Sequence, residues 1–453
     1  MTNGKPLPII LRFCIPVLLG TVFQQFYNVA DTMIVARYIG AEAPLAAVGT
    51  TGPLNFLVLG FVIGICIGFC IPVAQRFGAG DIKEMRRFAA NAVYLCAFFA
   101  VVLTTVTLLF ARDLLQLMDV PEDIIDLSYS YIHKVFIGIP AVIAFNIQAC
   151  MLRALGDSKA PLYFLAIASV VNVIMDLVFI IVFGWGLAGA GLATVVAQTT
   201  SAVLCFIYIR RNYPILRFTK DEVKASLIHF RKLLFMGVPM GLQFTITAIG
   251  SVILQRAING LNDAVIIASM TTGQRISMLM FLPMESLGIT LATFAGQNLG
   301  AGKLGRIKQG LRITIGLQFI YSAVAAILMW FLGRYMAAVF VGFGETEIMR
   351  LVGFHLRVTG LGLWTIGILF IFRNLLQGLG YSFLAMFAGV SELVGRMLVA
   401  FVLVDRFGFY GACFAGVISW LLADMVLIPA YFVVMGKLKR KGLIPVEKEI
   451  SEA

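Results

Sequence analysis

Long apolar segments alternate with short polar connections along the whole chain. About twelve of these segments are long enough to cross a membrane as a helix. They begin near residues 9, 44, 88, 127, 161, 189, 233, 264, 312, 349, 383 and 409. No small-residue cleavage site follows the first segment, so we expect a transmembrane helix there and not a removable signal peptide. The pattern therefore predicts an all-α membrane protein with twelve transmembrane helices.

Composition and charge favour a polytopic membrane protein. Of the 453 residues, 60% are hydrophobic and only 13% are charged, which is too apolar for a soluble domain. The net charge of +12 is spread unevenly, because about 25 of the 35 lysines and arginines lie in alternate connections. By the positive-inside rule these connections and both termini face the cytoplasm, which requires an even number of spans. Membrane topology thus accounts for the basic charge, and nucleic acid is not expected as a partner.

The two halves of the chain resemble each other. The segment AQRFGAG, residues 74–80, recurs as GQNLGAG, residues 296–302, and Pro16 corresponds to Pro239. The offset stays near 222–224 residues throughout, which indicates a duplicated six-helix unit. Because six is even, both copies enter the membrane from the same side, and a pseudo-twofold axis along the membrane normal is expected.

This duplication predicts how the chain is divided. We expect an N-terminal six-helix bundle (residues 1–209), a basic cytoplasmic linker (210–232), a C-terminal six-helix bundle (233–436) and a cytoplasmic tail (437–453). Two bundles with a cavity between them suit transport by alternating access. No Walker A loop occurs, so uphill transport would depend on an ion gradient. Pro16 removes a backbone hydrogen bond in the first helix and is a candidate hinge.

Five acids fall inside predicted spans, where a charge costs roughly 2.5–3.5 kcal/mol on insertion scales. They are Asp31, Asp176, Glu285, Glu392 and Asp424. Asp31 and Asp176 are expected at similar depth in the outer half of the membrane.

Two polar neighbours accompany this first pair of acids. Asn172 shares a helix face with Asp176, and Thr194 reaches a similar level. Two carboxylates, an amide and a hydroxyl suit a proton or a hard cation, so Na+ could bind at Asp31 and Asp176. The alternative is that these are separate polar residues satisfied by the neighbouring backbone.

The C-terminal half has a different polar set. Leu254, Arg396 and Ala400 stand where Asp31, Asn172 and Asp176 would recur, so the cation site is expected in the N-terminal half alone. Glu392 and Arg396 are spaced i, i+4 and form either a mutually neutralising pair or part of a ligand site. Glu285 follows a proline and has no local partner. Candidate substrate-binding residues are Gln24, Tyr27, Arg275, Glu285 and Glu392, whereas Asp424 is expected to be mainly structural.

Enzymatic chemistry has little support in the sequence. The histidines His133, His229 and His355 are scattered singly, His229 is expected to be solvated in the basic linker, and neither HExxH nor GxSxG occurs. All seven cysteines lie in predicted helices, without a disulfide framework or a CxxC metal motif. We therefore expect small apolar packing residues at these positions and no enzyme.

Several motifs together resemble one family. The first helix with Pro16 ends in YNVADT, the two GAG turns follow, LRALGDSKAP spans residues 152–161, and Asn172 precedes Asp176 by four. This combination resembles the MATE (multidrug and toxic compound extrusion) transporters, in particular their prokaryotic DinF-like branch. The resemblance implies an N-lobe cation network of Asp31, Asn146, Asn172, Asp176 and Thr194. Thr247 stands where the NorM-like branch has a glutamate, which favours the DinF-like arrangement.

The resemblance also implies a function and a location. It implies export of small organic compounds, often cationic or amphipathic, in exchange for H+ or Na+. The expected location is the lipid bilayer of the bacterial cytoplasmic (inner) membrane, and we expect a monomer that needs no cofactor beyond the coupling ion. One alternative is a flippase for a lipid-linked precursor, for which only Arg275, Arg357 and Arg396 could make the cavity cationic. A non-transport intramembrane enzyme is the other alternative.

Overall fold

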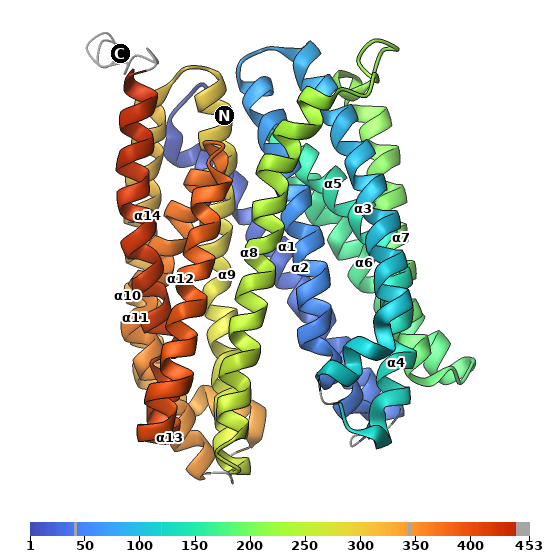
Figure 1. The fold of residues 1–453 in the computed structure, drawn as a ribbon, viewed down its shortest axis with the longest axis vertical. Coiled ribbons are helices and arrows are strands. Elements are labelled where there is room, and N and C mark those ends of the chain that lie inside the picture. The colour runs from blue at the N-terminus through green and yellow to red at the C-terminus, as the bar shows by residue number, and fades with distance from the viewer. Residues whose placement is uncertain (40–42, 119, 343, 345, 441–453) are drawn as a thin grey trace. The chain divides into compact units, whose positions relative to one another are not determined.

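The computed structural model describes residues 1–440 apart from 40–42, 119, 343 and 345. The predicted tail therefore lies outside the described residues from 441 onward. The described chain is helical (Figure 1). The first half contains α1 Pro6–Tyr38, α2 Ala43–Gly78, α3 Ile82–Leu117, α4 Glu122–Ile137, α5 Ile139–Ala154, α6 Lys159–Leu177 and α7 Gly186–Asn212. The second half contains α8 Leu227–Asn259, α9 Ala264–Gly300, α10 Leu304–Val341, α11 Thr346–Gly378, α12 Ser382–Leu398, α13 Val404–Cys413 and α14 Ala415–Arg440.

The predicted spans are confirmed. Within the described residues, 11 helices are long and apolar enough to cross a membrane, and α4 with α5 forms a further span bent by 45°. The bend lies at Gly138, just before Pro140 in the first turn of α5. Proline has no N–H and cannot complete the helical hydrogen bonds there, which accounts for the break. Counting the bent pair as one span gives up to 12.

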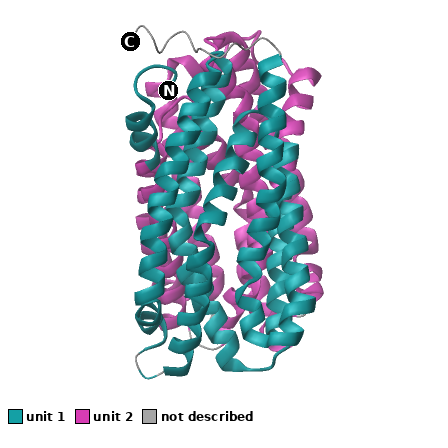
Figure 2. Cartoon of the chain, turned by 90° about the vertical axis from the view of Figure 1, so that its left-hand side faces the viewer, with its two compact units in different colours: residues 1–14, 242–453 teal, residues 15–241 magenta. Residues whose placement is uncertain are grey.

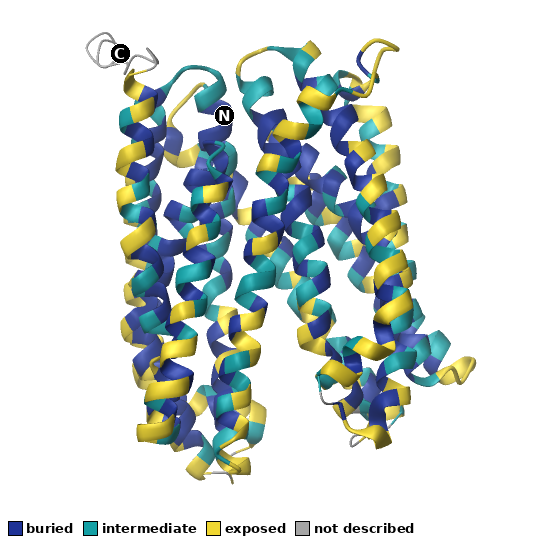
Figure 3. Cartoon of the chain, in the orientation of Figure 1, coloured by how far each residue is buried: buried dark blue, intermediate teal, exposed yellow. Residues whose placement is uncertain are grey.

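Many large apolar side chains are exposed on the helix surfaces (Figure 3). Val101 and Leu109 on α3 are exposed, as are Met425 and Phe432 on α14. A soluble protein rarely exposes long apolar faces of this kind, whereas lipid is a suitable solvent for them. The seven cysteines are buried free thiols.

The chain forms two compact units, coloured in Figure 2. The N-terminal unit comprises residues 15–241, and the C-terminal unit comprises residues 1–14 and 242–453. The bundles 1–209 and 233–436 were predicted from membrane topology and stay a prediction, since the units are defined by packing. Two helices belong to both units: α1 changes unit after Cys14 and α8 after Gly241. Each change lies within two residues of the helix-internal proline, Pro16 or Pro239.

The duplication is visible in the backbone. The two GAG turns end in glycines with left-handed φ angles, 72° at Gly80 and 73° at Gly302, a conformation that costs other residues free energy. A five-residue π-helix follows α6 at Val178–Val182, and another follows α12 at Val399–Leu403. Such π segments often occur near functional sites, and Asp176 stands two residues before the first of them.

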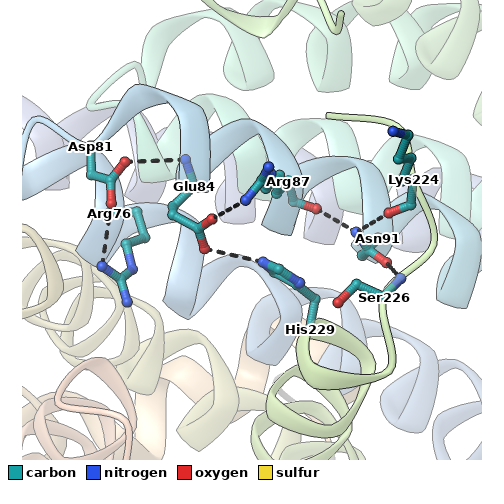
Figure 4. A network of polar contacts seen from close by, with 8 residues as sticks. All are labelled: Arg76, Asp81, Glu84, Arg87, Asn91, Lys224, Ser226 and His229. Carbon is teal, nitrogen blue, oxygen red and sulfur yellow. Dashed lines mark hydrogen bonds and ion pairs between the residues drawn. The ribbon is translucent and has the colours of Figure 1, made fainter. Parts of the chain in front are cut away.

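The basic linker is fixed to α3 of the N-terminal unit (Figure 4). Asn91 accepts a 2.9 Å hydrogen bond from the Ser226 amide, and the Tyr94 hydroxyl donates to the Val223 carbonyl at 2.9 Å. The prediction that His229 is solvated is wrong: its side chain is only 12% exposed, and Nε2 lies 3.1 Å from Glu84 Oε2. Basic composition suggested solvent exposure, but an acid on a neighbouring helix covers the imidazole.

Candidate functional site

A small cavity lies inside the N-terminal unit, among α1, α2, α4, α5 and α7. Its volume is about 100 Å³. It is lined by five of the predicted site residues, which are Gln24, Tyr27, Asp31, Asn146 and Thr194. The cavity has room for several water molecules or a partly hydrated ion. It is far smaller than the roughly 300–1,000 Å³ of pockets for drug-sized ligands, so it suits an ion better than an organic molecule.

Asp31 and Asp176 lie beside each other at this cavity. The Asp31 carboxyl group interacts with that of Asp176, although Asp176 and Asn172 on α6 are not part of the cavity lining. Asp31 is buried, and Asp176 and Asn172 are fully buried. The structure therefore brings together the two acids that the sequence placed at matched depth.

The buried polar atoms around these acids lack hydrogen-bonding partners. Within the described residues, no partner is found for Asp31 Oδ1, for both carboxylate oxygens of Asp176 or for both amide atoms of Asn172. Asn146 and Thr194 differ, because they donate to carbonyl groups of their own helices, Val142 at 2.8 Å and Ala190 at 3.3 Å. Hydrogen bonds to the neighbouring backbone therefore satisfy Asn146 and Thr194, as the alternative predicts, but they do not satisfy the two acids.

Sequence analysis missed two polar residues of the cavity. Asn55 and Gln198 line it, and Asn55 Oδ1 and Gln198 Oε1 have no hydrogen-bonding partner in the described chain. Gln198 follows Thr194 by four residues and shares its helix face, a signal that could have identified it. Asn55 has no such local signal, because its position in the cavity depends on how α2 packs against α4 and α5.

The side chains that line the cavity offer carboxylate, amide and hydroxyl oxygen atoms. No group of three His, Cys, Asp or Glu side chains in the described ranges is placed to hold a metal ion. A Na+ ion would therefore have to combine carboxylates with amide, hydroxyl or water oxygens, which are the ligands that hard cations prefer. A proton would need one carboxylate, and two adjacent carboxylates favour its binding because both cannot ionise cheaply.

The predicted acids of the C-terminal unit have cationic partners. Glu392 lies 3.5 Å from Arg396 on the same helix, as the neutralising-pair alternative predicts, and 3.5 Å from Arg373 on α11. Arg373 was missed because it stands 19 residues away on another helix. Glu285 also lies near Arg373, without a hydrogen bond in the described chain.

The other predicted residues of this unit are dispersed. Arg275 is exposed and has neither a hydrogen bond nor an ion pair in the part of the chain that the structure describes. Asp424 is buried, and the Glu392 carboxyl group is close enough to act on it electrostatically. Gln243 and Gln377, which were not predicted, lie with their amide groups 2.8 Å apart, and the Gln243 amide oxygen can be turned to within 3.2 Å of Arg373. The structure therefore groups Glu285 and Glu392 around Arg373 and leaves Arg275 apart.

Comparisons with known proteins agree with the fold and the duplication. The sequence model of the MatE family matches twice, at residues 16–178 and 239–402, which together cover more than half of the chain. A probable multidrug resistance protein of Bacillus subtilis, YoeA, is 29% identical over 76% of this chain and 77% of its own length. The FAD transporter of Shewanella oneidensis is 22% identical over 86% of each chain.

Solved structures show the same fold. A MOP superfamily transporter from Pyrococcus furiosus superposes with a TM-score of 0.90 at 20% identity, covering 97% of this chain and 98% of its own. An outward-facing multidrug resistance MATE family transporter gives a TM-score of 0.89 at 21% identity, with 96% and 97% covered. At these identities the likeness shows the fold alone.

Proposed function

The chain belongs to the MatE family of multi-pass membrane transporters, and we propose that it is a multidrug efflux antiporter. It would export small organic compounds, often cationic or amphipathic, in exchange for H+ or Na+. Relatives such as the probable multidrug resistance protein of Bacillus subtilis support the export of drugs. The observation that carries the proposal is the pair Asp31 and Asp176, buried side by side without a hydrogen-bonding partner for most of their oxygens.

Ion binding at this pair would drive transport through its charge. Ionised carboxylates are tolerated when the cavity is wet and are costly when it is closed and dry. A bound H+ or Na+ would neutralise the pair and favour the closed form, since a ligand shifts an equilibrium only by its differential affinity. Helix α1, which carries Asp31, passes from one unit to the other next to Pro16. A bend at Pro16 would then connect ion binding to alternating access.

Location and assembly are part of the same proposal. The protein would act as a monomer in the bacterial cytoplasmic membrane, with both termini in the cytoplasm and no cofactor other than the coupling ion. The excess of lysine and arginine in alternate connections supports this orientation. An enzyme is not indicated, because the family and the relatives are transporters. A flippase for an anionic lipid precursor has less support, since Arg396 is engaged by Glu392.

The first experiment measures efflux of a fluorescent organic cation from proteoliposomes under an imposed H+ or Na+ gradient. We expect one gradient to drive export by the wild type, and Asp31→Asn or Asp176→Asn to abolish gradient-driven export. Asp221→Asn is the matched control, because this acid of the linker is exposed and pairs only with Lys224 among the described residues. Full gradient-driven export by both site variants would contradict coupling at this pair. No export by the wild type under either gradient would favour the flippase.

A further inference from the structure

The connection between α6 and α7 in the N-terminal unit exposes an apolar turn, residues 181–185. Every residue of this turn is exposed, with 71% of Val182, 52% of Phe183 and 49% of Trp185 accessible. The connection, green in Figure 1, extends to the side of the unit, and exposed residues form its tip (Figure 3). Proteins rarely leave large apolar side chains gathered in water, so the turn marks a contact surface.

The aromatic rings of the apolar turn are held in place by α7. The ring centroids of Phe183 and Trp185 are 5.0 Å apart, and both rings stack on Phe179, at 6.0 Å and 5.1 Å. The Trp185 amide donates a 2.9 Å hydrogen bond to the Phe179 carbonyl. Phe179 lies against Gly189 of α7, where an added Cβ atom would be 3.0 Å from the Phe179 Cβ. The exposed rings are therefore ordered before any partner binds, which lowers the entropic cost of contact.

The apolar turn continues a lipid-facing stripe along α6. Tyr163, Ile167, Val170 and Ile174 are between 41% and 60% exposed, and their spacing of i, i+4, i+7 and i+11 places them on one helix face. This face belongs to a helical segment that is long and apolar enough to cross a membrane. Ile181, 50% exposed, extends the stripe into the π segment at the start of the turn. The surface that lipid covers on α6 therefore reaches the turn without a polar interruption.

Charge distinguishes this turn from its counterpart in the C-terminal unit. Residues 177–209 contain no aspartate, glutamate, lysine or arginine. At the repeat offset of 224 residues, Asp405 and Arg406 stand where the N-terminal unit has Ile181 and Val182, and all four are exposed. Charged side chains are costly in lipid and favourable in water, whereas the reverse holds for large aliphatic ones. The repeat therefore places equivalent exposed positions in water in one unit and in lipid in the other.

We propose that the apolar turn is a membrane anchor, which binds phospholipid where the acyl chains meet the headgroups. Val182 and Phe183 contact the acyl chains. The Trp185 indole combines a large apolar body with one N–H donor and suits the boundary, where tryptophan and tyrosine are enriched. Tyr163 stands at the other end of the same stripe. The anchor fixes the depth in the membrane of α6, which carries Asp176 of the candidate site.

The experiment measures quenching of tryptophan fluorescence in lipid nanodiscs that hold one copy of the full-length protein. The lipids carry bromine either near the headgroup end or near the terminal end of their acyl chains. Because the chain has four tryptophans, the contribution of Trp185 is the difference between the wild type and Trp185→Phe. We expect this contribution to be quenched most by bromine near the headgroup end and little by iodide in the water. Trp420→Phe is the control, because Trp420 is buried and its loss should leave the quenching by lipid unchanged.

Three results would overturn the anchor. Quenching of Trp185 by iodide and not by brominated lipid would place the turn in water. Strongest quenching by bromine at the terminal end would place it deep among the acyl chains and not at the boundary. Quenching by lipid that is present in nanodiscs but lost in densely packed proteoliposomes would show that a second copy of the chain covers the turn.

A second variant tests the comparison between the two units. Ile181→Asp/Val182→Arg introduces the residues that stand at these positions in the counterpart turn. We expect Trp185 emission to shift to longer wavelength and to lose most of its quenching by lipid, because the charges favour water. The reverse exchange, Asp405→Ile/Arg406→Val, is the matched control and should leave Trp185 unchanged. An unchanged Trp185 signal in the first variant would contradict the proposal. None of these measurements depends on transport, so this proposal and the proposed function can fail separately.

Discussion

The two units share one duplicated design but bury their acids in different surroundings. In the N-terminal unit, Asp31 and Asp176 stand side by side, and no lysine or arginine of the described chain forms an ion pair with either. In the C-terminal unit, Glu392 lies between Arg373 and Arg396. An acid without a cationic partner can gain free energy by binding an ion, whereas a paired acid gains much less. The difference supports the proposal that ions exchange at the unpaired acids Asp31 and Asp176.

A second difference lies where the first helix of each half packs against the second helix of the other half. In the N-terminal unit, Gly68 of α2 meets Gly237 of α8 backbone to backbone. The positions that correspond to them by the repeat offset are Thr290 of α9 and Cys14 of α1, whose side chains contact each other in the C-terminal unit. The same contact is thus made by two glycines in one unit and by a hydroxyl and a thiol in the other.

The largest expected effect on stability comes from breaking the ion pairs of Glu392. Arg373→Met should lower the free energy of unfolding by about 3 kcal/mol, because one oxygen of a buried carboxylate loses its partner. Arg373→Met/Glu392→Met should recover most of the loss, since it removes the charge together with its partner. Thermal or chemical unfolding in detergent measures both. Arg350→Met is the control, because its pair with Glu347 is exposed, and it should change little. A double variant as unstable as the single one would contradict the role of charge.

Hydrophobicity, repeated turns and helix periodicity predict the fold and part of the candidate site from the sequence. Spans follow from hydrophobicity, and the duplication follows from repeated turns such as the two that end at Gly80 and Gly302. Asn172 and Asp176 were found because i, i+4 spacing fixes a helix face. Asn55 and Arg373 were not found, because each joins its site through packing between helices that are distant in sequence. Periodicity within one helix contains no information on such partners.

A smaller effect is expected at the contact between α2 and α8. A Cβ atom added at Gly68 would lie 2.8 Å from the Met236 carbonyl oxygen, and the opposing atoms are backbone. Gly68→Ala should therefore cost roughly 1–3 kcal/mol of unfolding free energy, as overpacking does. Thr290→Ala at the corresponding position of the C-terminal unit loses a hydroxyl without a clash and should cost about 1 kcal/mol or less.

The control for this prediction lies in the same helix α2. A Cβ atom at Gly49 would meet no atom within 4 Å, so Gly49→Ala should be neutral or slightly stabilising. Equal losses for Gly68→Ala and Thr290→Ala would mean that the two contacts are equivalent despite their different residues. The measurement is the unfolding midpoint of each variant in the same detergent.

The smallest effect concerns the linker, where Glu222 contacts both the linker backbone and Arg86 of α3. Glu222 accepts a 2.8 Å hydrogen bond from the Thr219 amide and lies 3.4 Å from Arg86. The Thr219 amide, followed by the Arg86 charge, lowers the pKa of Glu222 from its usual value of about 4.3. Because the pKa of Glu222 is lower in the folded linker than in the unfolded chain, ionised Glu222 stabilises the linker at pH values above this usual pKa. That contribution to stability is lost as the pH falls through the lowered pKa. Amide hydrogen exchange of residues 219–226 should therefore speed up in acid, beyond the intrinsic change in exchange rate.

Glu222→Gln separates this charge from the rest of the linker. The amide cannot ionise, so at neutral pH the variant should already show the faster exchange that the wild type shows in acid. The expected loss is about 1 kcal/mol or less, which corresponds to roughly fivefold faster opening. Asp221→Asn is the matched control, because the neighbouring acid is exposed and its loss should leave exchange unchanged. If Asp221→Asn had the same effect as Glu222→Gln, the linker would be held by its overall charge and not by the contacts of Glu222 with Thr219 and Arg86.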